Sequence, residues 1–396
     1  MTARRYYLDN CASTMLDTRV AQAISRAMTD VAGNPSSIHH EGQRTARALA
    51  QARATVADSL GARPPEIVLT SSGTEANNLA VRGVISHAVR TTGSAHVVTS
   101  TVEHASVSTA LKWEQRLLGD RLRVTQVPVD GDGALDLPAL DAALAGDDVS
   151  LVSLLYVNNE TGVIQDLDAL KARKLAHPAI PWHLDLVQAY TRLPWDVRLL
   201  PFDLLAVSAH KIHGPMGVGA LYVRGGTAMD ALLVGGAQEK YRRAGTENLL
   251  GAIGLAEAVQ IAPSPEERSR HLTLLETEFL GALHSLDTRF RIQGAKHPGA
   301  RRLPGFLNLS FPGAACREDL QIALDLEGVS LSSTSACHSG VSEPSHVLRA
   351  MGITGEALEG AIRLQFDYSH TPADAADCAA IMSRVLGRLT QTMELA

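Results

Sequence analysis

Short apolar runs recur along the first part of the chain, and helical patterns separate them. The runs lie at 66–70, 96–101, 123–129, 149–157, 181–188, 202–208 and 218–223. The run at 149–157 is almost continuously apolar, as expected for a strand that is covered on both faces. Strands that alternate with helices favour a mostly parallel sheet, so the sequence predicts an α/β fold.

Polar or charged residues follow or end five of these runs. They are Thr74, His104, Asn159, Asp185 and Lys211. Open α/β sheets bind ligands beyond the carboxyl ends of their strands. We therefore expect these side chains to meet at one edge of the sheet and to form a single site there.

Lys211 lies in the stretch 208–223, where an apolar strand enters a Gly/Pro-rich turn and a second apolar run follows. The stretch contains no Asp or Glu that would pair with the lysine. A desolvated lysine has a lowered pKa and becomes a nucleophilic amine suited to Schiff-base chemistry. A turn lysine that extends into solvent fits the same local pattern, so the rest of the chain has to decide between the two.

The turn at 71–78 follows the run at 66–70 and leads into a helix. A small-residue turn at a helix N-terminus is suited to anion binding, because free N–H groups and the positive end of the dipole face one point. Gly73 permits close approach, and Thr74 adds a hydroxyl donor. Dinucleotide glycine spacing and the P-loop lysine are both missing, which favours a single phosphate. An ordinary Ser/Thr helix cap is the alternative.

Together these features describe a pocket for pyridoxal 5′-phosphate (PLP). Asp185 would keep the pyridine nitrogen protonated, so that the ring accepts electrons. His104 would stack on the ring, and Gln188 would reach the ring oxygen. The predicted phosphate ligands are Thr74, Ser208 and His210.

The four cysteines are widely spaced and form no CxxC pair, so neither a disulfide framework nor a metal site is predicted. Cys337 lies among Ser, Gly and Thr residues with few apolar anchors. We expect it to be exposed and mobile, and a reactive thiol is favoured there. Cys316 and Cys378 are predicted to be structural, whereas the sequence leaves the role of Cys11 open.

Arg363 lies among apolar neighbours in a short predicted strand at 360–366. Its planar guanidinium would suit a substrate carboxylate. A structural ion pair is the alternative at this position.

The bulk properties predict a cytoplasmic globular protein. The chain has 396 residues, is 45% hydrophobic and 20% charged, and carries a formal net charge of −6. This charge argues against a nucleic-acid or anionic-membrane binder, and no signal peptide or membrane span is recognisable. We expect a large PLP-binding domain at 15–262 and a smaller α/β domain at 263–396, with 1–14 packing on the smaller one.

With these motifs in hand, the chain resembles the NifS/IscS-like cysteine desulfurases, which are class V aminotransferase-fold PLP enzymes. The resemblance covers nearly the whole chain and implies the PLP-dependent transferase fold of type I. The motifs that carry it, in order, are Tyr7–Asn10, Asn34–Ser37, Ser72–Asn78, Glu103–His104, Asn158–Gly162, Asp185, Gln188, Ser208–Pro215, Arg242–Asn248, Ser335–Cys337 and Ile362–Arg363.

The resemblance also implies residue roles. Lys211 would bind PLP as a Schiff base and shuttle protons, and Cys337 would take the sulfur of L-cysteine as a persulfide, leaving alanine. A nearby cation such as protonated His104 would favour the Cys337 thiolate; His338 is another acid/base candidate. The remaining implied contacts are Arg363 and Asn34 to the substrate carboxylate, Asn159 to the ring oxygen and substrate, and Thr246 to the phosphate of the neighbouring subunit in a homodimer.

Two departures from the family pattern bear on substrate and partner. Asp367 and Tyr368 replace a glycine and a basic residue after Arg363, and the chain ends at Ala396, soon after its last predicted helix. The sulfur acceptor is accordingly expected to be an iron–sulfur scaffold or the thiolation enzyme of a dedicated pathway for nucleic acid, DNA phosphorothioate or a natural product. The alternatives are a selenocysteine lyase, aminotransferase or epimerase of the same fold, or a non-catalytic sulfur-relay scaffold.

Overall fold

The computed structural model describes residues 4–296, 299–311, 317–333 and 344–394. Its main sheet has seven strands. In spatial order they are β2 (Ile67–Thr70), β9 (Gly219–Val223), β8 (Leu204–Ser208), β7 (Trp182–Asp185), β5 (Leu151–Leu155), β3 (Ala95–Ser100) and β4 (Leu122–Val127). Only β9 runs antiparallel to its neighbours. The prediction of an α/β fold with a mostly parallel sheet is therefore confirmed.

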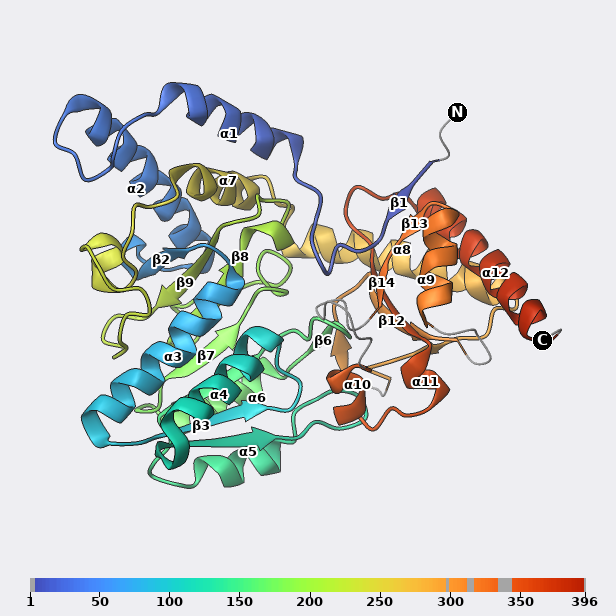
Figure 1. The fold of residues 1–396 in the computed structure, drawn as a ribbon. Coiled ribbons are helices and arrows are strands. Elements are labelled where there is room, and N and C mark those ends of the chain that lie inside the picture. Colours follow the sequence, from blue (N-terminus) through green and yellow to red (C-terminus); the bar gives the residue numbers. More distant parts are fainter. Residues whose placement is uncertain (1–3, 297–298, 312–316, 334–343, 395–396) are drawn as a thin grey trace.

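Helices cover both faces of this sheet (Figure 1). The helices are α1 (Thr18–Asp30), α2 (His40–Leu60), α3 (Gly73–Thr92), α4 (Ala105–Leu118), α5 (Leu137–Leu144), α6 (Leu167–Ala176) and α7 (Leu249–Gln260). Alternate strand residues enter different cores: Leu204 and Ala206 of β8 pack with α3 and α4, whereas Leu205 and Val207 pack with α2 and α7. Because successive side chains of a strand face opposite ways, this pattern buries both faces.

A second, antiparallel sheet lies toward the C-terminus, in the order β10 (Arg291–Ile292), β12 (Phe306–Ser310), β15 (Ala361–Gln365) and β14 (Ser332–Ser333). The helices α8 (Pro265–Ser285), α9 (Arg317–Leu326) and α12 (Pro372–Glu394) accompany it (Figure 1). The N-terminal strand β1 (Tyr6–Tyr7) pairs with β13 (Val329–Ser330). Tyr6 and Leu8 belong to the same apolar core as these C-terminal elements.

The remaining elements are short. Strand β6 (Val163–Ile164) pairs with β11 (Arg301–Arg302), and the short helices are η1 (Pro64–Glu66), η2 (Gly119–Arg121), η3 (Ala209–Lys211), η4 (Gln238–Tyr241), α10 (His346–Ala350) and α11 (Glu356–Glu359). The core of the main sheet also takes in Leu303, Val347 and Met351. The proposed division at 262/263 stays a prediction.

The start of α8 follows directly from its sequence. Ser264 accepts a hydrogen bond from the Glu267 N–H, Glu267 accepts one from the Ser264 N–H, and Pro265 occupies the first helical position. This capping box satisfies two donors that a helix end would leave unpaired. Across the described ranges, no helix is both long and apolar enough to cross a membrane.

Candidate active site

A cavity of about 260 Å³ lies at the carboxyl edge of the main sheet. Of the residues predicted from the sequence, those that line it are Gly73, Thr74, His104, Asn159, Asp185, Gln188, Ser208, His210, Lys211 and Arg363. Parallel strands end at the same edge of a sheet, which explains why residues far apart in the sequence meet here.

Lys211 ends the short helix η3, which directly follows β8. Its Nζ atom donates to the main-chain carbonyls of Cys11 and Ala12, at 2.7 and 2.6 Å. Cys11 is buried, and burial raises the pKa of its thiol. The lysine amine is therefore held inside the cavity, beside a thiol that stays protonated, and does not extend into solvent.

Asp185 ends β7 and is 2% exposed. Its Oδ2 accepts from the Asn77 amide at 2.6 Å, and its Oδ1 accepts from the Val187 N–H at 2.9 Å. Burial raises the pKa of this carboxyl, while those two donors and the charge of Lys211 act against the rise. The Asn77 and Val187 donors thus orient the carboxyl group, which lines the cavity as a buried acceptor.

His104 caps the N-terminus of α4. Its Nδ1 accepts from the Ser106 N–H at 3.1 Å, so the ring proton is on Nε2. Burial, followed by the charge of Lys211, lowers its pKa to about 4. The protonated form of His104 invoked from the sequence is therefore disfavoured, because burial and a neighbouring cation both oppose a second charge. Its effect on the Cys337 thiol stays a prediction, since Cys337 lies outside the described residues.

The N-terminus of α3 forms one end of the cavity. A Cβ atom added to Gly73 would lie 2.8 Å from Val187 Cγ2 and 3.2 Å from Ser208 Cβ, so only glycine leaves this approach open. The buried Ser208 hydroxyl has no hydrogen-bond partner within the part of the chain that the structure describes. The N-terminus of α3, the space left by Gly73 and the unpartnered Ser208 hydroxyl together suit the phosphate group of PLP.

Gln188 is positioned by two bonds. Its Nε2 donates to the Cys11 carbonyl at 2.9 Å, and its Oε1 accepts from Arg192. Arg192 also donates to the main-chain carbonyls of Gln188 and Lys211, at 3.1 and 2.9 Å. The second amide hydrogen of Gln188 remains for the ring oxygen predicted as its partner.

Arg363 reaches the cavity from β15 of the antiparallel sheet and is 5% exposed. Its Nη1 donates to the Asn159 carbonyl at 2.8 Å, and its Nη2 donates to Ser332 Oγ at 2.7 Å. Asp9 Oδ1 lies 3.7 Å from the same guanidinium. The ion pair considered from the sequence is thus present, and it holds a cation at the cavity wall.

Two predicted residues, Asn34 and Thr246, do not line this cavity. Asn34 is exposed, and its Oδ1 accepts from the Ser36 N–H. Thr246 is exposed in the segment that precedes α7. Cys337 and His338 lie outside the described residues, as does Cys316, whereas Cys378 is buried in α12. The roles predicted for Asn34, Thr246 and Cys337 stay predictions.

Sequence reasoning missed the residues that hold the cavity together. Asn77 binds Asp185 and the Ser106 hydroxyl, and Ser106 in turn contacts His104. Asn77 lies one helical turn after Gly73, a spacing that places both on the same face of α3. This spacing could have been recognised in the sequence. By contrast, nothing in the sequence near Arg192 indicates its contacts with Gln188 and Lys211.

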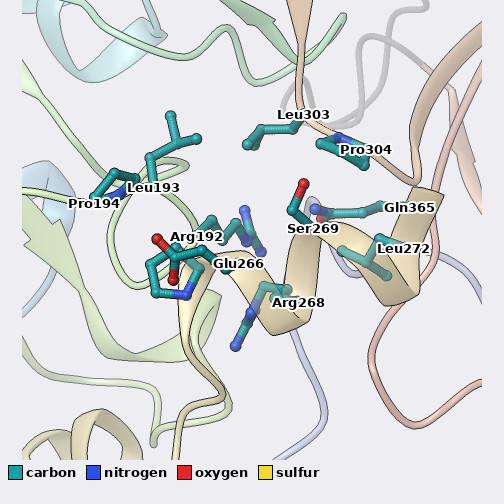
Figure 2. Close-up of a pocket in the computed structure, with 11 residues that line it drawn as sticks. Arg192, Leu193, Pro194, Glu266, Arg268, Ser269, Leu272, Leu303, Pro304 and Gln365 are labelled. Atoms are coloured by element: carbon teal, nitrogen blue, oxygen red, sulfur yellow. The ribbon is translucent and has the colours of Figure 1, made fainter.

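A second cavity of about 390 Å³ lies on the other side of Arg192. Figure 2 shows Leu193 and Pro194 on one side of it and Leu303 and Pro304 on the other. Arg192 lines this mostly apolar cavity and also donates to the Lys211 carbonyl.

A lysine amine, a buried carboxyl group, an imidazole and a helix N-terminus that line one cavity are the arrangement expected of a PLP-dependent enzyme. The comparisons agree. The family described as Aminotransferase class-V matches residues 6–376. A cysteine desulfurase IscS of Dictyoglomus turgidum is 38% identical over 388 residues, covering 98% of this chain and 95% of that protein.

Solved structures extend this similarity to three dimensions. A NifS-like protein matches with a TM-score of 0.88 at 32% identity, covering 97% of this chain and all (100%) of that one. DndA from Streptomyces lividans matches with a TM-score of 0.74 at 33% identity, covering 91% and 99%. The chain belongs to the class V aminotransferase family, among the NifS/IscS-like cysteine desulfurases.

Proposed function

We propose that this chain is a PLP-dependent L-cysteine desulfurase, which converts L-cysteine to L-alanine and passes the sulfur to an acceptor protein through a persulfide on Cys337. The observation that carries the proposal is the position of Lys211, whose Nζ lies in one cavity with Asp185, His104 and Arg363. The choice of L-cysteine as the substrate is supported by the relatives that are named cysteine desulfurases.

The cofactor would be held at three points. Lys211 would anchor it covalently through Nζ, Asp185 would accept a hydrogen bond from the protonated ring nitrogen, and the N-terminus of α3 with Ser208 would bind the phosphate. When bound, PLP supplies an electron-accepting ring that labilises the bonds at the α and β carbons of the substrate. His104 would stay neutral beside the ring. Asp185 would then balance the charge of the protonated ring nitrogen.

The substrate would be oriented by Arg363, because a guanidinium in a buried wall binds a carboxylate with fixed geometry. Lys211 Nζ would accept the proton that leaves the α carbon of the bound substrate. The thiolate of Cys337 then attacks the substrate sulfur. An S–S bond forms, the Cβ–S bond breaks, and its electron pair stays on the carbon skeleton, which is protonated and leaves as alanine.

We also propose a homodimer. The segment that precedes α7 exposes Val234 (85%) and Tyr241 (74%), and Thr246 follows them. Exposed apolar side chains of this size are typical of an interface. A second copy that covers the segment would bring Thr246 to the phosphate of its partner.

The first experiment is an absorption spectrum of the purified protein, followed by addition of L-cysteine and assays for alanine and sulfide. We expect the visible band of lysine-bound PLP, a spectral change with cysteine, and equimolar alanine and sulfide under reducing conditions. A cofactor band without alanine would refute the reaction while leaving the family assignment intact.

The thiol is tested with a matched pair of variants. Cys337→Ala should abolish alanine formation, whereas Cys378→Ala should retain it, because Cys378 is buried in α12 and burial raises the pKa of its thiol to about 12, which makes it a poor nucleophile. Full turnover in Cys337→Ala would favour a lyase or aminotransferase reaction that needs no thiol. Transfer of labelled sulfur from the Cys337 persulfide to a candidate acceptor then tests the partner.

A further inference from the structure

The second cavity, of about 390 Å³, contains none of the residues predicted to bind the cofactor or the substrate. Its lining comes from four places in the fold: the segment 192–194 between β7 and β8, the N-terminal part of α8, the turn at 303–304 between β11 and β12, and Gln365 of β15 (Figure 2). Proteins bind small molecules in pockets of about 300–1,000 Å³. This cavity is therefore large enough to hold a small ligand.

Most of the cavity wall is apolar. Leu193 and Pro194 lie on one side, and Leu303 and Pro304 lie on the other (Figure 2). Leu272 of α8 belongs to the same wall and is 5% exposed. A ligand gains binding free energy here when it removes apolar surface from water, so its body should be apolar.

Two buried guanidinium groups add positive charge to this wall. Arg268 is 4% exposed, and its Nε and Nη2 atoms have no hydrogen-bond partner within the described ranges, although its guanidinium lies 5.3 Å from the centroid of the Tyr368 ring. Arg192 is 6% exposed and donates to uncharged oxygens of Gln188 and Lys211. Buried N–H groups of a cation cost free energy when they are unpaired, and a bound anion would recover it.

One buried carboxylate serves both of these cations. The charge of Asp367 raises the pKa of Arg192 and of Arg268, yet burial holds both pKa values below the usual value for arginine. Asp367 does not line the cavity, and its Oδ1 contacts His213 Nε2 at 3.0 Å. Glu266 lines the cavity but is exposed to solvent, which screens its charge. The buried charges therefore leave a net positive charge beside the cavity.

Two uncharged polar side chains also line the cavity. Gln365 is 2% exposed, and its Oε1 has no hydrogen-bond partner in the part of the chain that the structure describes. Figure 2 shows its amide pointing toward Ser269, whose hydroxyl both donates and accepts. Gln365 follows Arg363 by two residues on β15, so the two side chains lie on the same face of the strand. Arg363 lines the cavity that contains Lys211, and Gln365 lines the second one.

We propose that the second cavity binds a small monocarboxylate with an apolar body. The carboxylate would lie at Arg268 and Arg192, and the apolar body would lie between Leu193 and Leu303. One negative charge matches two buried cations that share one buried carboxylate, and the apolar walls offer nothing to a second charge. The ligand would contact Arg192, which donates to the Lys211 carbonyl, without entering the cavity that Lys211 lines. The proposal uses neither PLP nor cysteine and so goes beyond the proposed function.

The first test measures binding of hexanoate to the full-length protein by isothermal titration calorimetry. The matched probes are 1-hexanol, which has the same chain without the charge, and hexylammonium, which has the opposite charge. We expect hexanoate to bind at one site and at least about tenfold more tightly than 1-hexanol, because hydrogen bonds to charged groups are the stronger ones. No saturable binding of hexanoate, or equal affinities for hexanoate and hexylammonium, would overturn the proposal.

The second test locates the carboxylate. Arg268→Met keeps the apolar stem and removes the charge, so hexanoate binding should weaken by about tenfold or more while 1-hexanol binding stays the same. Arg384→Met is the matched control, because Arg384 is exposed and pairs with Glu327 on the surface. Arg363→Met tests the other cavity. Loss of hexanoate binding in Arg363→Met with full binding in Arg268→Met would place the carboxylate beside Lys211 and refute the proposed site.

A variant that changes no charge covers the case in which Arg268→Met does not fold. Ser269→Leu places an isobutyl group at the wall of the second cavity and leaves both arginines in place. It should abolish saturable binding of hexanoate, whereas unchanged affinity would show that the ligand binds elsewhere. None of these measurements depends on turnover of cysteine, so their failure and a failure of the desulfurase assay can be told apart.

Discussion

The Nη2 atom of Arg192 donates to the main-chain carbonyl of Lys211 across 2.9 Å. The same guanidinium donates to the main chain of Gln188 and contacts its side chain. Burial, and then the charge of nearby Arg268, lowers the pKa of Arg192 to about 10, so the group remains a cation at neutral pH. The buried guanidinium of Arg192 thus orients both Gln188 and Lys211, which line the cavity.

Replacing Arg192 by Lys should keep the charge but lose the fork that reaches two carbonyls at once. We expect kcat to fall about 10–100-fold, the range typical of residues that orient ligands of a site. Steady-state kinetics with L-cysteine measure this. Arg173→Lys is the control, because Arg173 lies on α6 and pairs with the exposed Asp141 on α5, away from the cavity. Equal kinetics in the two variants would show that the Lys211 carbonyl needs no such support.

Asp185 offers a second prediction. Asp185→Asn keeps the bond from the Val187 N–H but cannot balance a protonated ring nitrogen. Turnover should fall by about 100-fold or more, as when a preorganised charge partner is removed, while the visible cofactor band persists. Asp196→Asn serves as the control, because Asp196 pairs with the exposed Arg198 and does not line the cavity. Normal turnover in Asp185→Asn would exclude this carboxylate as the ring partner.

Glycine at position 73 leads to a third prediction. In Gly73→Ala the new methyl group would crowd Val187 and Ser208, at 2.8 and 3.2 Å. We expect PLP affinity to fall by about tenfold or more, because the first turn of α3 must move away from the phosphate. Equilibrium titration of the cofactor-free protein with PLP measures the loss.

A helix glycine with open space around it provides the control for that substitution. Gly281 lies in α8, and a Cβ atom there would meet nothing within 4 Å. Gly281→Ala should stabilise the protein by about 0.5–1 kcal/mol and leave PLP affinity unchanged. Weaker PLP binding in both variants would point to a general loss of stability.

The sequence placed the cavity correctly for a physical reason. Each run of apolar residues had to be a strand covered on both faces, and the polar residue after it had to lie at the carboxyl edge. Thr74, His104, Asp185 and Lys211 meet there as expected. Arg363 comes from a separate antiparallel sheet, so its place in the cavity followed from the family resemblance and not from the strand pattern.

Contacts between distant segments were beyond sequence reasoning. The bond from Arg192 to Lys211 depends on how two turns pack, and no local pattern records it. The helix α7 was also missed. Its sequence, Leu249–Gln260, is apolar on most sides because it is buried between α1 and α2, so it lacks the polar face that marks a helix. The charge state of His104 likewise depends on burial that only the folded chain reveals.

Glu103, beside His104, gives the last prediction. It is 1% exposed, and its Oε1 accepts from the Leu155 N–H at 3.0 Å and from the Ser100 hydroxyl. Burial raises its pKa from 4.5 to about 8, although these donors act against the rise. The folded protein therefore holds a proton that the unfolded chain has released, and this contribution to stability is lost as the pH rises through the folded-state pKa.

Glu103→Gln should remove that dependence, because an amide accepts the same two bonds and does not ionise. Between pH 4.5 and about 8 the wild-type protein should lose up to about 1.4 kcal/mol of stability per pH unit relative to the variant. Thermal unfolding midpoints across this range measure the difference, with Glu278→Gln on the exposed face of α8 as the control. The variant should be the more stable protein at the alkaline end, and parallel curves for the two proteins would mean that Glu103 is ionised in the folded state.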